Sequence, residues 1–216
     1  MALLQRTGIY GSYWGDEQNS SHGLTYAQME VNATYIYSAL SYGGWSIESI
    51  SAMLGNMQTE SSINPGRWQG NNVGVGPAYG LVQWDPFTKY TQWATNLGFD
   101  YSTMDSNLDR INYELENGLQ WISTSSYPMS FSEFKTATGS PYDLAMAFLY
   151  NYERPASLNQ PSRGTQAEAW YTYLTGQTPT PPGPGPGPSP GGSYRRNGFN
   201  FVLFNRRRRV RYGRQR

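Results

Sequence analysis

The residue with the clearest chemical potential is Glu60, which continues an apolar stripe at helical spacing. The stripe consists of Ile47, Ile50, Leu54 and Met57, and one further step of three positions reaches Glu60. A helix through this segment would place the carboxyl group on its core-facing side, in the last turn. Partial burial and the negative end of the helix dipole would both favour the protonated form. A protonated carboxyl group is what glycoside cleavage needs as a general acid.

A plainer interpretation is that Glu60 is a solvated residue at a frayed helix end, and the pattern alone leaves both interpretations open. Glycoside cleavage often uses a second carboxylate, and two candidates follow in the sequence. Asp85 lies 25 residues after Glu60, but an Asp before Pro is typical of a helix N-cap, which is the role we favour. Glu153 is followed by Arg154 and Pro155, which indicates a helix C-terminus with local pairing.

Composition excludes several other kinds of site. The chain has no cysteine, so thiol nucleophiles, cysteine-ligated metals and disulfides are ruled out. His22 is the single histidine, which rules out a two-histidine zinc site and any serine triad that does not use this residue. We therefore expect no metal and no cofactor.

Helix start and stop signals cover most of the segment that surrounds Glu60. Thr25 and Gln28 form a capping box, Ser130 and Glu133 form another, and Ser140 precedes a proline. Helices are expected to begin near residues 25, 46, 85, 105, 130, 140 and 165, the last of them ending before Gly176. Residues 66–84 are rich in glycine and predict a loop with a short β element at 79–84. The predicted fold class is mainly α, with one Gly-rich β/loop excursion.

Charge and composition divide the 216-residue chain into four parts. We predict an N-terminal extension (1–24), a catalytic domain (25–176), a Pro/Gly linker (177–193) and an Arg-rich arm (194–216). Residues 1–194 hold seven basic and 15 acidic residues, whereas residues 195–216 hold nine basic and no acidic ones. The segment Arg195–Arg216 is therefore expected to bind a polyanion, such as teichoic acid or DNA, or an acidic protein partner.

The chain lacks the apolar segments that export or membrane insertion would need. The apolar run before Arg6 is too short for a signal peptide, and no stretch of 18 apolar residues predicts a transmembrane helix. The region after residue 176 contains no histidine, so no zinc peptidase domain is expected there.

Three segments carry a resemblance to a known superfamily. They read MLGNMQTESSINPG (53–66), YGLVQW (79–84) and AMAFLYNYERP (145–155). They resemble the Glu-Ser with Asn-Pro, Gly-Leu-x-Gln and Tyr-Asn motifs of lysozyme-like proteins and lytic transglycosylases. The sequence from about residue 25 to 176 is most similar to the tail lysozymes of small short-tailed phages of Gram-positive hosts.

This resemblance implies a lysozyme-like helical domain that cleaves the glycan of peptidoglycan, with Glu60 as the catalytic glutamate. The substrate-binding residues that it implies are Gln83, Tyr79, Trp84, Trp68, Asn64, Tyr150 and Asn151. Each has a structural alternative, since Asn64 suits a turn and the aromatic residues suit a core. The choice between hydrolysis and transglycosylation stays open.

The expected function is that of a muramidase-type hydrolase in the phage virion tail, made in the host cytoplasm and opening the host wall locally as DNA is delivered. Peptidoglycan strands and other tail proteins are its expected partners. A free endolysin is one alternative. Another is a structural or polyanion-binding virion protein whose lysozyme-like body binds the wall without cutting it.

Overall fold

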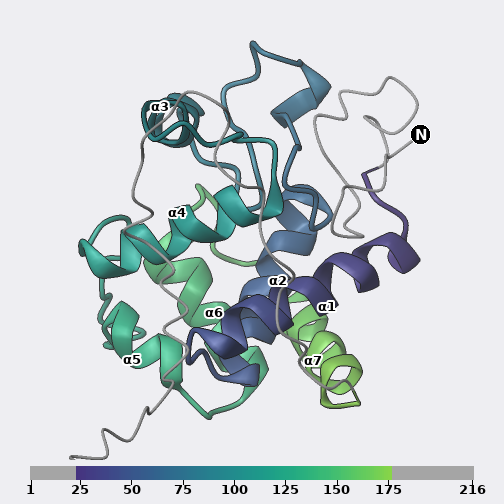
Figure 1. Ribbon diagram of the computed structural model, residues 1–216. Helices are drawn as coiled ribbons and strands as arrows, with labels where there is room; N and C mark the ends of the chain where they lie inside the picture. Colours follow the sequence, from purple (N-terminus) through teal and green to yellow (C-terminus); the bar gives the residue numbers. More distant parts are fainter. Residues whose placement is uncertain (1–22, 177–216) are drawn as a thin grey trace, which may run out of the picture.

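The computed structural model describes residues 23–176, which form the mainly helical domain shown in Figure 1. Its elements are α1 (Tyr26–Tyr42), α2 (Ile47–Ser61), the 3₁₀ helix η1 (Gln69–Asn71), α3 (Thr88–Asn96), α4 (Met104–Glu116), α5 (Phe131–Thr136), α6 (Pro141–Phe148), the π-helix η2 (Leu149–Glu153) and α7 (Ser162–Thr175). The mainly α fold class is confirmed. The linker, the arm and residues 1–22 of the N-terminal extension lie outside the described residues, so those predictions stay untested.

Side-chain caps begin several helices where the sequence predicts them. The Thr25 hydroxyl accepts the Gln28 backbone N–H, and the Gln28 side chain accepts the Thr25 backbone N–H. Ser130 and Glu133 form the second predicted capping box. Each cap satisfies backbone donors that lack a partner within the helix, which is why these short polar patterns locate helix starts well.

Helix α3 begins later than the sequence predicts, and the predicted cap at Asp85 is wrong. The helix starts at Thr88, with Phe87 at the N-cap position and no side-chain cap. The Asp85–Pro86 peptide bond is cis, and Asp85 itself is exposed. The backbone N–H of Phe87 donates to the carbonyl of Pro77. The Gly-rich segment therefore holds the residues before α3, which the local sequence pattern could not indicate.

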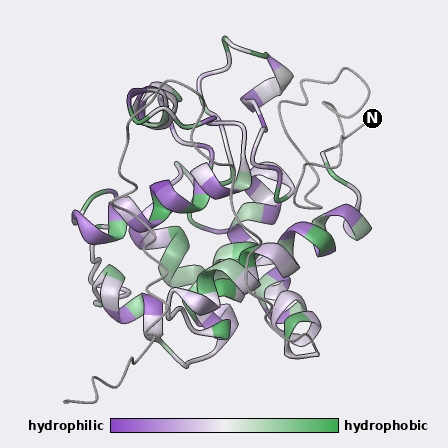
Figure 2. Cartoon of the chain, viewed as in Figure 1, coloured by the Kyte–Doolittle hydropathy of each residue, from purple (hydrophilic) through white to green (hydrophobic). Residues whose placement is uncertain are grey.

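Helix α2 is the centre of the domain. It packs against α7, α6 and α1, and every residue from Ser49 to Met57 is buried. Figure 2 shows the most hydrophobic ribbon at this centre, along α2 and α6. Since α2 is enclosed along most of its length, its last turn is the part that can carry a polar group to the surface.

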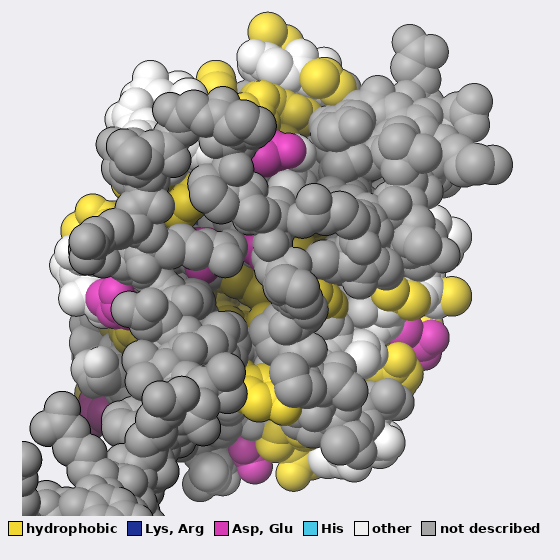
Figure 3. Space-filling view, viewed as in Figure 1, with side chains coloured by type: hydrophobic (Ala, Val, Ile, Leu, Met, Phe, Trp, Pro, Cys, Tyr) yellow, Lys and Arg dark blue, Asp and Glu magenta, His cyan; other side chains and the backbone are white. Residues whose placement is uncertain are grey.

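The surface of the described part is modestly acidic. Residues 23–176 hold 13 acidic and six basic residues. On the face shown in Figure 3, acidic side chains of the described residues lie at separate points among apolar ones. No helix within residues 23–176 combines the length and apolar character needed to cross a membrane.

The Gly-rich segment, residues 66–84, folds as a chain of turns against the end of α2. Its β content is two isolated antiparallel bridges, Trp68 to Tyr79 and Tyr79 to Trp84, so the predicted β element is reduced to single pairs. The hydroxyl of Ser61 donates to the carbonyl of Leu81 at 2.9 Å. The residue next to Glu60 therefore fixes this segment in place.

A buried carboxylate, Glu114 of α4, links the Gly-rich segment to η2. It accepts hydrogen bonds from Arg110 Nε at 2.8 Å, from Trp84 Nε1 at 3.0 Å and from the Tyr152 hydroxyl. Burial raises the pKa of Glu114, while the bonds from Tyr152 and Arg110 oppose the rise. One side chain thus joins parts of the fold that are far apart in sequence.

We predict that Glu114→Ala lowers the free energy of unfolding by about 3–5 kcal/mol, because it leaves a buried guanidinium and two further donors without their acceptor. Urea unfolding followed by circular dichroism measures this. Glu116→Ala, at an exposed position of the same helix, is the control and should change the value by less than about 0.5 kcal/mol. Equal losses for both variants would contradict a central role for Glu114.

Candidate active site

Glu60 lies in the last turn of α2, as the sequence predicts. The helix ends at Ser61, and Ser62 adopts a left-handed conformation with φ of 56°. The Glu60 side chain is 20% exposed, so it is neither enclosed in the core nor freely solvated. This burial argues against the plain interpretation of a frayed, solvated end.

Arg163, at the start of α7, is the closest charged partner of Glu60. Its Nη2 lies 2.6 Å from Glu60 Oε1, and its side chain is 4% exposed. Its other nitrogens are also bonded, with Nε donating to Gln160 at 2.7 Å and Nη1 to Asn56 Oδ1 at 3.1 Å. The ion pair places a buried positive charge directly beside the Glu60 carboxyl group.

Sequence reasoning missed Arg163 because it placed the start of the last helix at Thr165. The helix begins at Ser162, directly after Pro161 at the N-cap position. The proline was the available signal, since a proline favours the first turn of a helix. Arg163 and Glu60 lie 103 positions apart in the chain, so no local sequence pattern indicates their ion pair.

The contact between α2 and α7 requires a glycine. A Cβ added at Gly55 would lie 2.3 Å from the carbonyl oxygen of Arg163 and 2.8 Å from the backbone nitrogen of Ala167. Neither backbone atom can move aside as a flexible side chain would. Gly55 therefore lets the two helices approach closely enough for Arg163 to reach Glu60.

Glu153, at the end of η2, is the second carboxyl group of this site. Its Oε1 atom is buried and has no hydrogen-bond partner among the described residues, although the residue as a whole is partly exposed. Burial raises its pKa well above the ordinary range, and the charge of Glu60 raises it further, while Arg163 acts in the opposite direction. This setting favours the protonated form of the Glu153 carboxyl group.

The predicted local pairing of Glu153 with Arg154 is wrong. Arg154 ends the π-helix in a left-handed conformation, and its guanidinium donates to the backbone carbonyls of Gln120 and Asn151. These hydrogen bonds hold the Arg154 guanidinium against the backbone, and no ion pair with Glu153 forms in the described part of the chain. Of the two arginines that lower the pKa of Glu153, Arg163 has the larger effect and Arg154 the smaller.

Two of the aromatic residues predicted to bind substrate are core residues instead. Tyr79 is fully buried, and Trp84 is 3% exposed, with its ring nitrogen bonded to Glu114. Their rings pack against Tyr90 of α3, with centroids 6.2 Å and 4.4 Å away. Neither ring face is open to a sugar, because the Gly-rich segment needs both to build its own small core.

The predicted amides of the Gly-rich segment hold its backbone. Asn64 Oδ1 accepts the backbone N–H of Gly66 at 2.9 Å, which is the turn role that the sequence favours. Gln83 has a positive φ of 48°, and its amide donates to the carbonyls of Arg67 and Gly80. Both residues therefore shape the segment beside Glu60.

The third motif also has a structural role. Asn151 is buried, accepts two hydrogen bonds from Thr124 and donates one to the carbonyl of Tyr127. The Tyr150 ring, which is half-buried, lies 5.1 Å from the Tyr127 ring. These contacts fasten the loop before α5 to η2, the element that carries Glu153.

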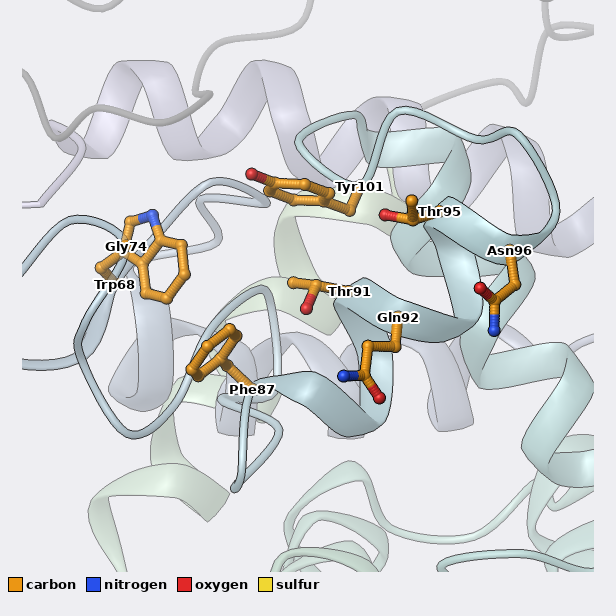
Figure 4. A pocket seen from close by; sticks show the side chains of 8 residues that line it. All are labelled: Trp68, Gly74, Phe87, Thr91, Gln92, Thr95, Asn96 and Tyr101. Carbon is orange, nitrogen blue, oxygen red and sulfur yellow. The ribbon is translucent and has the colours of Figure 1, made fainter.

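Trp68, which is 5% exposed, lines a cavity of about 250 Å³ between the Gly-rich segment and α3 (Figure 4). Trp68, Gly74 and Phe87 form one side of the cavity, Tyr101 closes another, and α3 supplies Thr91, Gln92, Thr95 and Asn96. The cavity therefore combines aromatic rings with amide and hydroxyl groups. Within the described residues, no group of three or more acidic or histidine side chains converges as metal ligands would.

Comparison with known proteins shows which family the chain belongs to. The model of the phage tail lysozyme family matches residues 31–174, which include Glu60, Glu153 and Arg163. The chain belongs to the phage tail lysozyme family. Another phage protein, morphogenesis protein 1 of Bacillus phage B103, is 51% identical over 155 residues, covering 71% of this chain and 42% of that protein. This tail lysozyme chain thus spans less than half the length of that relative.

We predict that Gly55→Ala disrupts the site from a distance. The added methyl group must push α7 away from α2, which should lower the free energy of unfolding by at least about 1–3 kcal/mol. It should also move Arg163 away from Glu60.

Gly139→Ala is the matched control, because a Cβ there would meet no atom within 4 Å. Thermal unfolding of both variants measures the loss of stability. Full stability in Gly55→Ala would contradict the role of this contact.

Proposed function

We propose that this protein hydrolyses the glycan strands of peptidoglycan, with Glu60 as the general acid. The observation that carries the proposal is the placement of Glu60, which is partly buried in the last turn of α2 yet keeps one-fifth of its side chain exposed. A general acid must reach the substrate from a position that is partly shielded from water. Membership of the phage tail lysozyme family supports the same substrate and the same class of reaction.

In the proposed reaction, Glu60 gives its proton to the glycosidic oxygen as the bond between that oxygen and the anomeric carbon breaks. The positive charge that develops at the anomeric carbon is then quenched by water, which adds its hydroxyl group there. The proton released by the water restores Glu60. Atoms and charges balance with water as the single co-reactant.

Glu153 does not suit the role of an ionised nucleophile, because burial raises its pKa and favours the protonated form. Asp85 is exposed in the segment before α3, so it lacks the shielded surroundings of a catalytic carboxylate. The proposal is therefore a mechanism with one acidic residue in direct contact with the substrate.

The proposed setting is the phage tail, from which the enzyme opens the host wall locally during delivery of DNA. The family name and the designation of the B103 relative as a morphogenesis protein both support association with the virion. Peptidoglycan strands and neighbouring tail proteins are the proposed partners.

The direct test is Glu60→Gln, which keeps the shape of the side chain and removes its transferable proton. Turnover of purified peptidoglycan should fall by about 10²–10⁴-fold, with binding to the insoluble glycan retained. Glu48→Gln, in the first turn of the same helix, is the matched control and should keep normal turnover. A fully active Glu60→Gln would reject the proposed mechanism and favour a wall-binding body without catalysis.

We further propose that the cavity beside Trp68 holds part of the glycan, because rings next to amide groups suit the apolar faces and polar edges of sugars. Gln92→Ala should raise KM about 2- to 10-fold at unchanged kcat, since it removes one hydrogen bond made equally in the ground and transition states.

Lys89→Ala, an exposed position of the same helix that does not line the cavity, is the control for Gln92→Ala. Initial rates on soluble glycan fragments provide both kinetic constants. An unchanged KM in Gln92→Ala would show that the glycan does not bind in this cavity.

A further inference from the structure

The guanidinium of Arg163 is buried, and each of its three nitrogens donates to a side chain, one from the residues just before α7 and two from α2. Two of its three side-chain partners, Gln160 and Asn56, are neutral, and the third is Glu60. Asn56 is itself held by donating to the carbonyls of Ala52 and Ala145. The neutral partners fix the orientation of the guanidinium, and its charge acts on Glu60.

The start of α7 cannot readily shift away from this position. A Cβ at Gly55 would lie 2.3 Å from the Arg163 carbonyl, and a Cβ at Gly164 would lie 2.4 Å from the ring of Tyr142. The backbone on both sides of Arg163 is therefore in direct contact with α2 and α6. Such close packing suits a residue whose charge must stay at a fixed distance from a reacting group.

Two charged groups of the described residues act together with Glu60. Arg163 of α7 forms the ion pair with it, and Glu153 of η2 interacts with both Glu60 and Arg163 electrostatically. Burial favours the protonated form of Glu153, so this group competes less with Glu60 for the positive charge of Arg163.

We propose that Arg163 is a positioning residue that sets the acid strength of Glu60. The inference rests on the proposed function of Glu60 as the general acid. When Glu60 gives up its proton, its carboxylate becomes negative, and the guanidinium 2.6 Å away stabilises that product. Arg163 thereby lowers the barrier to proton donation. The same attraction makes Glu60 lose its proton at a lower pH, so it also limits the alkaline end of the activity range.

The test compares Arg163→Gln with Arg163→Lys in pH profiles of kcat/KM on soluble glycan fragments. Arg163→Gln removes the charge, so activity at its pH plateau should fall, while the midpoint of the alkaline limb should move upward by about one pH unit. Arg163→Lys keeps the charge and should keep the midpoint near that of the parent protein. Arg154→Gln, which removes a cation that contacts backbone carbonyls, is the control and should leave the midpoint in place.

A second measurement does not depend on turnover. The side-chain carboxyl carbon of Glu60 can be followed by ¹³C NMR across a pH titration and assigned by its absence in Glu60→Gln. Its midpoint should also move upward in Arg163→Gln. An unmoved midpoint would overturn the inference, whereas a moved midpoint in a protein without glycan cleavage would support the inference and reject the proposed function.

Glu153→Gln tests whether Glu153 carries a negative charge that affects Glu60. If Glu153 is protonated over the working range, a neutral amide in its place should leave the Glu60 midpoint unchanged in the NMR titration. A midpoint that falls would show that Glu153 carries a negative charge there. That result would contradict the claim that Arg163 acts on Glu60 alone.

Discussion

Helices α2 and α7 approach each other so closely at Gly55 that an added Cβ would lie 2.3 Å from the carbonyl oxygen of Arg163. This contact brings the last turn of α2, with Glu60, beside the first turn of α7, with Arg163 and Gln160 nearby. The next residue along α2, Ser61, bonds to the Gly-rich segment through Leu81. The position of Glu60 relative to α7 and to the Gly-rich segment thus depends on the close contact between the backbones of α2 and α7 at Gly55.

The candidate site brings together groups that would each be unfavourable alone. A buried arginine costs free energy unless its donors are satisfied, and here Glu60, Gln160 and Asn56 satisfy them. Glu153 is kept neutral by burial, so it adds no second negative charge beside Glu60. Glu114, farther inside, gathers three donors around its carboxylate and stabilises the junction between α4, the Gly-rich segment and η2. The polar interior is therefore organised by a small number of well-satisfied charges.

Local chemistry explains which parts could be predicted from the sequence. The caps at Thr25 and Ser130 depend on residues three positions apart, and the position of Glu60 depends on one apolar stripe of a helix. Each of these features can therefore be predicted from a short stretch of sequence. The later start of α3 depends on a backbone bond from Phe87 to Pro77, in the separate Gly-rich segment. The burial of Tyr79 and Trp84 depends on packing against α3, and the role of Arg163 depends on a contact between distant helices. These tertiary contacts leave no short sequence pattern, which is why the site was predicted only through Glu60 and the approximate surroundings of the three motifs.

We propose that the protein breaks glycosidic bonds of peptidoglycan by hydrolysis at Glu60. Mass spectrometry of the products released from purified peptidoglycan tests this proposal. Hydrolysis gives disaccharide-containing fragments with an ordinary reducing end, each heavier by one water than the anhydro form, and these fragments should be absent from a digest with Glu60→Gln. Anhydro ends would show that the reaction is transglycosylation, and intact glycan strands in the wild-type digest would show that the protein does not cleave the glycan.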